Sequence, residues 1–213
     1  MTANRPLLIT DCDEVLLHMI SHFRDWLSSE HNIDFVPHPE EFYGSMRRRD
    51  GQVVELVQAH ALLERFFETE MQRQTLVPHS IETLARISAV ADIVILTNLG
   101  DHHRDRRIDQ LDRLGIRHEV FCNQGGKGPP VARLIEERSP SSVVFVDDLP
   151  HHHESVARHA SHVWRLHMIA DPVKAHLIQP APDAHKRIDC WNEAADWIMD
   201  KLLHGQPATL AKT

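Results

Sequence analysis

The chain has 213 residues, with 23 basic and 31 acidic side chains and a formal net charge of −8 when its 18 histidines are counted as neutral. Apolar residues make up 42% of it, as in ordinary globular proteins, which excludes a disordered chain. The acidic balance argues against nucleic-acid partners, and no apolar run approaches the ~20 residues that cross a bilayer. Three cysteines in no zinc-binding spacing, and no export signal, favour a cytoplasmic location.

Five short apolar runs predict strands, because continuous apolar segments are typical of strands buried on both faces of a parallel sheet. They cover residues 6–10, 91–97, 119–122, 142–147 and 162–166. Helical periodicity predicts helices between and after them, at residues 81–89, 108–114, 131–137 and about 189–203. This alternation predicts the α/β class, with a parallel sheet covered by helices on both faces.

Residues 16–78 interrupt the alternation of strands and helices. Apolar stripes predict helices at residues 16–27 and 53–71, and no part of this segment has the pattern of a strand. We therefore expect an inserted α-helical domain at residues 16–78. The core domain then consists of residues 1–15 and 79–213.

Polar side chains stand at the ends of three of the predicted strands and in one glycine-rich loop. They are Asp11 and Asp13 after the first strand, Thr97 and Asn98 after the second, Asp147 and Asp148 after the fourth, and Lys127 in the loop. In open α/β sheets, ligands bind at the carboxyl ends of the strands. We therefore expect these side chains to meet in one site, although they are far apart in the sequence.

The residue types in this set suit phosphoryl chemistry. Several carboxylates placed together repel one another, and a hard divalent cation such as Mg²⁺ relieves that repulsion. One carboxylate can attack phosphorus, and a second can protonate the leaving oxygen and then activate water. Lysine supplies a fixed positive charge, and a threonine hydroxyl can donate to phosphate oxygens. Each residue alone is typical of a turn or a surface position, so the signal lies in the set.

As a set, these segments resemble the four motifs of the haloacid dehalogenase superfamily of hydrolases. Asp11-Cys12-Asp13 resembles the first motif, Thr97 the second, Lys127 the third and Asp147-Asp148 the fourth. The resemblance covers residues 6 to about 166. It implies a Rossmann-like core with a helical cap inserted between the first and second motifs, where residues 16–78 lie.

The resemblance also implies a role for each motif residue. Asp11 corresponds to the nucleophile, and Asp13 to the general acid/base, which also ligates Mg²⁺ through its backbone carbonyl. Lys127 would steady Asp11 and the phosphate. Thr97 and Asn98 would hold the transferred phosphate.

The magnesium ligands implied by the resemblance are Asp11, Asp13, Asp148 and Asp147. Asp148 matches the position that binds the metal directly, and Asp147 acts in support of it or through water. Cys12, between the two aspartates of the first motif, is expected to point into the core and has no catalytic role.

Two features of the first motif bear on the chemistry. The dehalogenases of the superfamily lack the aspartate that corresponds to Asp13, because their ester is opened at carbon and needs no such acid. The presence of Asp13 therefore favours phosphate chemistry. Glu14 stands where the family usually has glycine, which frees the backbone at the turn toward the cap. Two interpretations of Glu14 are open, an acidic group near the metal and a side chain that points to solvent.

Histidines and basic runs border the motifs. His102-His103 and His151-His152-His153 favour exposed loops, and adjacent histidines are poorly placed to share one metal. His18 and His22 lie one helical turn apart, and we hypothesise that they face the substrate. The basic runs at residues 46–49 and 104–107 are predicted to be solvated surface.

The leading interpretation is a magnesium-dependent phosphatase of a small phosphorylated metabolite, acting through an aspartyl phosphate. A phosphotransferase or mutase uses the same intermediate, and the sequence does not separate the two. A dehalogenase, a receiver-type signalling domain and a non-catalytic phosphate-binding relative are the further alternatives. The order of the acidic motifs and the insertion disfavour the receiver domain. The sequence does not indicate an oligomeric state.

Overall fold

Six parallel strands form the central sheet of the computed structural model, which describes residues 4–36 and 42–208. The strand order is β10-β9-β8-β1-β6-β7. The strands are β1 (Leu7–Thr10), β6 (Asp92–Thr97), β7 (Glu119–Cys122), β8 (Val143–Asp147), β9 (Trp164–His167) and β10 (Lys186–Arg187). Every pairing is parallel, which confirms the predicted α/β sheet.

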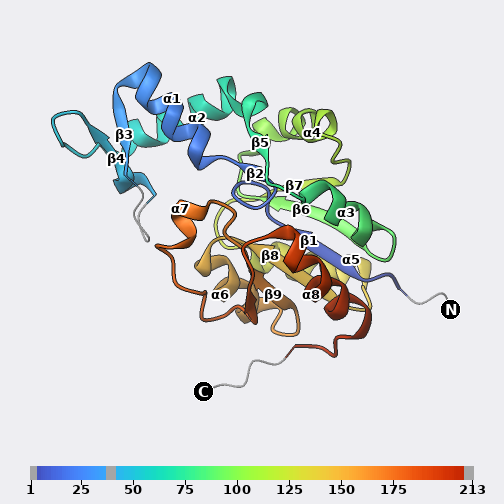
Figure 1. Ribbon diagram of the computed structural model, residues 1–213. Helices are drawn as coiled ribbons and strands as arrows, with labels where there is room; N and C mark the ends of the chain where they lie inside the picture. Colours follow the sequence, from blue (N-terminus) through green and yellow to red (C-terminus); the bar gives the residue numbers. More distant parts are fainter. Residues whose placement is uncertain (1–3, 37–41, 209–213) are drawn as a thin grey trace.

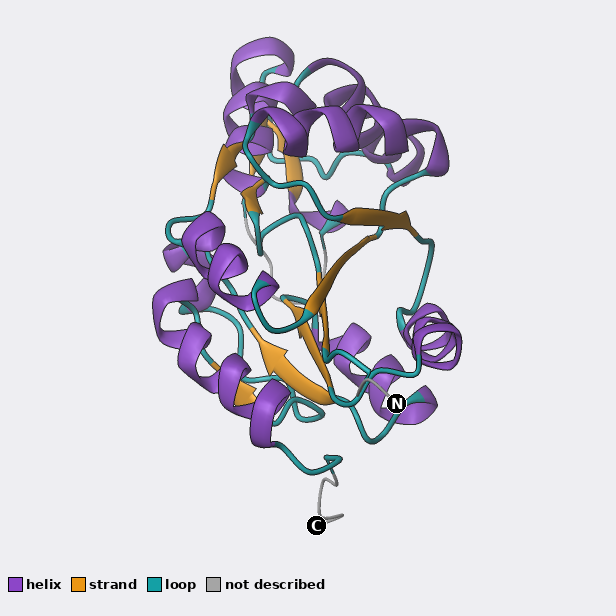
Figure 2. Cartoon of the chain, turned by 90° about the vertical axis from the view of Figure 1, so that its right-hand side faces the viewer, coloured by secondary structure: helices purple, strands orange, loops and turns teal. Residues whose placement is uncertain are grey.

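Helices cover both faces of the sheet, as the sequence predicts (Figure 2). They are α3 (Ser80–Ser88), α4 (Arg104–Arg113), α5 (Gly128–Arg138), α6 (Pro150–His159), the short α7 (Pro172–Ala175) and α8 (Trp191–His204). Side chains of α3 and α8 pack with one face of the sheet, and side chains of α5 and α6 pack with the other. Because successive strand residues point to opposite faces, β1, β6, β7 and β8 each contribute to both cores.

The segment between β1 and α3 forms a cap that lies to one side of the sheet (Figure 1). Its helices are α1 (Ile20–His31) and α2 (Leu56–Thr69), and they enclose an aromatic core of their own. Phe23 is central to that core, with the rings of Phe66, Phe35 and Phe42 between 5.1 and 5.8 Å from its own. We keep residues 16–78 as the predicted bounds of the cap.

The prediction of an insertion without strands is wrong. The segment contains two antiparallel pairs, β2 (Leu17–His18) with β5 (Thr75–Leu76) and β3 (Ile33–Phe35) with β4 (Met46–Arg48). It also contains the 3-10 turns η1 (Tyr43–Ser45) and η2 (Met71–Arg73). Strands of two or three residues are too short to show a period of two, so the sequence pattern does not reveal them. For the same reason the sequence pattern does not reveal β10, which has only two residues.

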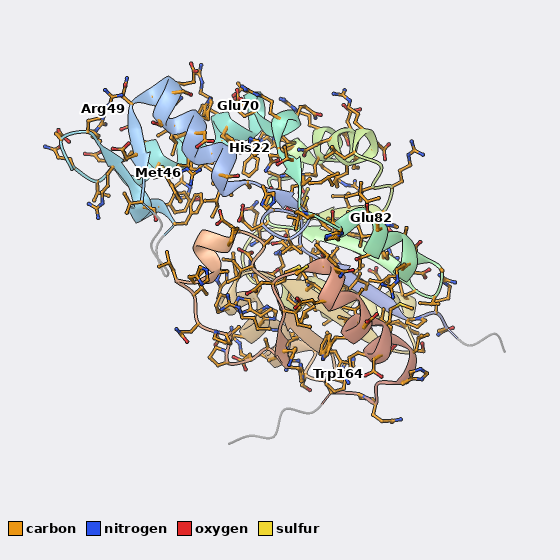
Figure 3. All side chains as sticks on the ribbon, in the orientation of Figure 1. His22, Met46, Arg49, Glu70, Glu82 and Trp164 are labelled. Atoms are coloured by element: carbon orange, nitrogen blue, oxygen red, sulfur yellow. The ribbon has the colours of Figure 1, made fainter. Side chains whose placement is uncertain are left out.

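The pair of β2 and β5 joins the cap to the core, because it places the segment that enters the cap beside the segment that leaves it. Leu99, which follows β6 of the core, is buried in the aromatic core of the cap. Arg49 of the predicted basic run lies at the outer end of the cap, far from the sheet (Figure 3). Within residues 4–36 and 42–208, no helix combines the length and apolar character that a membrane crossing requires.

Glu14 is a buried helix cap, so the interpretation that its side chain points to solvent is wrong. Its Oε1 atom accepts hydrogen bonds from the backbone N–H groups of Met19 (2.8 Å) and Ile20 (2.7 Å) at the start of α1. A carboxylate at this place satisfies N–H groups that have no partner within the helix and complements the helix dipole. Its backbone has φ = 61°, the left-handed conformation that glycine adopts without cost.

We expect Glu14→Ala to lower the free energy of unfolding by about 1–2 kcal/mol, because it removes the cap of α1. Glu14→Gly is expected to cost less, since glycine relieves a left-handed strain of about 1 kcal/mol. Urea denaturation of the two variants beside the wild type measures both effects. Equal stability of Glu14→Ala and the wild type would contradict the capping role.

Candidate active site

The carboxyl ends of β1, β6 and β8 place the polar residues of the predicted site. β1 lies between β6 and β8, and the backbone N–H of Asp11 donates to Val146 O at 2.9 Å. Asp11 therefore stands beside Asp147, the last residue of β8. Thr97 is the last residue of β6 and is buried on the other side of β1.

Lys127 is the electrostatic centre of the site. Its Nζ atom lies 2.8 Å from Asp11 Oδ1 and 2.7 Å from Asp147 Oδ2, and the whole side chain is shielded from solvent. Burial pushes the pKa of Asp147 up, but Lys127 and the nearby His152 and His153 together outweigh burial and hold this pKa at about 2. Burial raises the pKa of Asp11 well above its ordinary value despite Lys127, and the neighbouring carboxylates of Asp147 and Asp148 add to the rise.

Two glycines allow the lysine loop to approach α6. A Cβ atom on Gly126 would lie 2.5 Å from Ser155 Oγ, and one on Gly128 would lie 2.2 Å from Ser155 O. Ser155 Oγ also accepts the backbone N–H of Gly128 at 3.0 Å, at the start of α5. Close packing of this loop against α6 thus fixes the point from which Lys127 enters the core.

Asp11, Asp147 and Asp148 form a buried cluster of carboxylates, whose ligand atoms lie within 4.8 Å of one another. Carboxylates placed together repel one another, and an all-oxygen donor set suits a hard divalent cation. The cluster therefore fits the predicted metal. In the part of the chain that the structure describes, the carboxylate of Asp13 lies outside this cluster and has other partners.

Asp13 is held by a buried arginine of α4. Arg107 Nη2 donates to Asp13 Oδ1 at 3.0 Å and to Oδ2 at 2.8 Å, and Gln74 Nε2 donates to Oδ1 at 2.8 Å. Burial disfavours the charge of Arg107, but the attraction and hydrogen bonding of Asp13, with the charge of Asp11, together outweigh burial and raise the pKa of the guanidinium. These contacts fix the orientation of the Asp13 carboxylate.

Arg107 is the main residue of the site that the sequence analysis misses, and the prediction of a solvated basic run is wrong at this position. Its guanidinium also donates to Gln74 Oε1 (3.1 Å) and Gln110 Oε1 (3.0 Å) and lies 5.7 Å from the ring centre of Phe67. The sequence does place position 107 one turn before Leu111, on the apolar face of α4, which favours burial. The charged residues on either side of Arg107 instead favour a solvated surface, and the prediction follows them.

Asn98 joins the loops around the site rather than standing alone. Its Nδ2 atom donates to Gly125 O at 2.8 Å and lies 3.3 Å from His152 Nε2, and its Oδ1 atom accepts from Asn123 at 2.9 Å. The structure therefore brings Asn98 and Thr97 to the same edge of the sheet as Asp11. It adds His152 and Asn123 to the predicted set.

A cleft of about 360 Å³ opens above these residues, between core and cap. The core contributes Asp11, Asp13, Glu14, Thr97, Asn98, Gln124, Asp148, Leu149, His151 and His152, and the cap contributes Met19, Ile20, Phe42, Tyr43, Leu63 and Phe67. His18 and His22 are not among the described residues that line this cleft, so the hypothesis that they face the substrate gains no support from it. The Nε2 atom of His22 instead lies 3.1 Å from Oγ1 of Thr75 in β5.

The sequence predicts an exposed loop for the histidines after the fourth motif, and this prediction is wrong. They form the first turn of α6. His153 is buried, and its Nε2 atom donates to Asp147 O at 3.0 Å. His167 of β9 donates from Nε2 to Asp148 O at 2.9 Å. These two bonds fix the backbone of the acidic pair. Burial lowers the pKa of His153 to about 4 and that of His152 to about 3.

Comparison with solved structures identifies the fold. A haloacid dehalogenase-like protein of unknown function from Agrobacterium tumefaciens matches with a TM-score of 0.63 and 17% identity, over 91% of this chain and 97% of that one. A putative beta-phosphoglucomutase from Thermotoga maritima matches with a TM-score of 0.58 and 15% identity, over 92% and 98%. A 2-haloacid dehalogenase from Pseudomonas syringae matches with a TM-score of 0.53 and 16% identity, over 92% and 98%. No family model and no curated protein sequence matches the chain.

The chain therefore has the haloacid dehalogenase fold, as the motif resemblance implies. At these identities the similarity establishes the fold alone. The matched structures bear the names of different chemistries, a mutase and a dehalogenase. The residues of the site must therefore decide between them.

We expect the free energy of unfolding to fall as the pH drops from about 6.5 toward 4, partly because of His153. The unfolded chain binds a proton on this residue below its ordinary pKa of 6.5, whereas the folded chain does so only near 4. At about 1.4 kcal/mol per pKa unit, His153 accounts for a loss on the order of 3 kcal/mol.

Denaturation of His153→Gln across this pH range tests the assignment, because glutamine keeps a donor for Asp147 O but does not titrate. The variant is expected to lose less stability at acidic pH than the wild type. His151→Gln, an exposed neighbour on the same helical turn, is the matched control and should follow the wild type. Parallel pH profiles for wild type and His153→Gln would refute this role.

Proposed function

We propose that the protein is a magnesium-dependent phosphatase of a small phosphomonoester, acting through an aspartyl phosphate on Asp11. The observation that carries the proposal is the convergence of Asp11, Lys127 and Asp148 beneath a cleft that a second acidic residue, Asp13, also lines. The cleft volume of about 360 Å³ suits a metabolite rather than a folded protein substrate.

Asp11 is the nucleophile of the proposed reaction. Its Oδ1 atom is engaged by Lys127 at 2.8 Å and by the backbone N–H of Cys12 at 2.7 Å. These contacts fix the carboxylate, so that its other oxygen can attack phosphorus, and the bond to the leaving oxygen breaks. Thr97 and Asn98, at the end of the neighbouring strand, are placed to hold the phosphoryl group. Water then attacks phosphorus of the aspartyl phosphate and releases inorganic phosphate and the Asp11 carboxylate.

Asp11, Asp147 and Asp148 would hold the magnesium ion, with the backbone carbonyl of Asp13 as the further ligand that the resemblance implies. When bound, the ion neutralises the clustered carboxylates and the phosphate charge. Lys127 keeps Asp147 ionised for this role through its 2.7 Å contact.

Asp13 supports phosphate chemistry over dehalogenation, because opening an ester at carbon requires no acid at this place. Arg107 and Gln74 hold the Asp13 carboxylate at the edge of the cleft, where it can serve as the general acid and then as the base that activates water.

The proposal is tested by phosphate release from a panel of phosphorylated metabolites, with and without Mg²⁺. We expect turnover that requires the metal and disappears in Asp11→Asn, because the amide cannot attack phosphorus. Asp25→Asn, an exposed cap variant, is the control for the substitution itself. Turnover that survives in Asp11→Asn would contradict the aspartyl-phosphate mechanism. Transfer of the phosphoryl group to an added sugar in place of water would instead favour a mutase or phosphotransferase.

The contact between Arg107 and Asp13 makes a second prediction, about leaving groups. Proton transfer by a positioned carboxyl group is worth about 10²–10⁴-fold, and it matters most for an alkyl phosphate, whose leaving oxygen needs a proton that 4-nitrophenolate does not. Arg107→Gln removes the two hydrogen bonds that hold the Asp13 carboxylate, and we expect the alkyl-to-aryl ratio of kcat/KM to fall by roughly tenfold.

Arg106→Gln, on the exposed side of the same helix, is the matched control and should keep the wild-type ratio. Because Arg107 is buried, circular dichroism must first show that Arg107→Gln remains folded, and Arg107→Lys provides a milder variant. An unchanged ratio in folded Arg107 variants would show that the arginine does not restrain Asp13 during turnover.

A further inference from the structure

A second group of metal-ligating side chains lies outside the site described above, where the cap meets the core. Glu64 belongs to α2 of the cap, and His102 and His103 belong to the 3-10 turn η3 (Asp101–His103) of the core. The Nε2 atoms of His102 and His103 lie 3.0 and 3.1 Å from the same oxygen, Glu64 Oε2. The three potential ligand atoms all lie within 4.8 Å of one another.

We propose that Glu64, His102 and His103 bind a divalent transition-metal ion of the zinc class, which ties the cap to the core. Zinc ligands lie about 2.0–2.1 Å from the ion, so the donor atoms of a tetrahedral site are separated by about 3.3 Å. The observed separations of 3.0 and 3.1 Å are within a few tenths of an ångström of this edge length. Two imidazoles and one carboxylate form a donor set that favours zinc over magnesium.

Both imidazoles are held in place before any ion binds. His103 is only 2% exposed, and its ring centre lies 6.0 Å from that of Phe67. The ring of His102 is held by its contact with Glu64 and by the ring of His103, whose centre lies 4.0 Å from its own. The η3 turn thus directs the side chains of two adjacent histidines toward Glu64. Adjacent histidines are expected from the sequence to be poorly placed to share one metal, and this turn provides the exception.

Binding requires the Nε2 atom of each ring to give up its proton rather than a movement of the chain. In the hydrogen-bonded arrangement, the Nε2 atom of each ring donates to Glu64. In the metal-bound arrangement, Nε2 presents its lone pair to the ion and the ring proton resides on Nδ1. Glu64 and His102 have side-chain exposures of 52% and 61%, so an ion can enter from solvent and keep water as its fourth ligand.

An ion at this position would fix one wall of the cleft. Glu64 follows Leu63 on α2 and precedes Phe67 by three residues, and both of these neighbours line the cleft. A bond from Glu64 to the η3 turn therefore fixes the cap wall of the cleft relative to the core. This cross-link does not depend on the phosphatase activity, so it can be tested by binding alone.

The experiment titrates tag-free protein with Co²⁺, a spectroscopic substitute for Zn²⁺, in excess Mg²⁺ that occupies the carboxylate cluster. We expect the visible absorption of cobalt with nitrogen ligands, and its loss when Zn²⁺ is added. Glu64→Gln and His102→Ala are both exposed substitutions, and each should weaken cobalt and zinc affinity by at least about tenfold. Zinc should raise the melting temperature of the wild type but not of these variants.

Matched controls separate this site from the other histidines and acids of the chain. Glu68→Gln, one turn further along α2, and His162→Ala, an exposed histidine of the core, should keep wild-type affinity. Asp148→Asn removes a ligand from the carboxylate cluster and should leave the cobalt spectrum unchanged. Unchanged affinity in both Glu64→Gln and His102→Ala, or a spectrum that disappears in Asp148→Asn, would overturn the proposal.

Discussion

The site depends on one buried ammonium group placed between two buried carboxylates. Lys127 bridges Asp11, which follows β1, and Asp147, which ends β8, so it links two neighbouring strands at their carboxyl ends. Loss of one partner from such a group leaves an uncompensated charge in the core, at a cost of about 3–5 kcal/mol. The glycines that let the lysine loop approach α6, and the histidines that hold the acidic pair, all serve the placement of this one contact.

A second ion pair connects the chemistry to the cap. Arg107 holds Asp13 from the core, and the same guanidinium contacts Gln74, which lies where the chain returns from the cap. Glu14, which follows Asp13 in the sequence, caps the first helix of the cap. Asp13 and Glu14, two consecutive acidic residues after β1, therefore both contact the cap. Movement of the cap would alter the surroundings of Asp13 directly, whereas Asp11 is tied to the core alone.

The sequence predicts those parts of the fold that repeat over several residues. Buried strands such as β8 are continuous apolar runs, and the motif residues follow from their position at strand ends. Strands of two or three residues, such as β2 and β10, have no such pattern. The destination of a side chain also depends on partners far away in the chain, which is why the buried roles of Arg107 and His153 are not visible. Both are polar residues that only a tertiary partner makes stable in the core.

Burial also changes the meaning of the high histidine content. The number of histidines alone predicts a charge that changes strongly between about pH 5 and 7. His152 and His153 do not follow this expectation, because burial lowers their pKa values to about 3 and 4. At these positions a fall in pH removes stability instead of adding surface charge, because the unfolded chain takes up the protons first. The buried histidines beside Asp147 and Asp148 thus make this part of the site sensitive to acid.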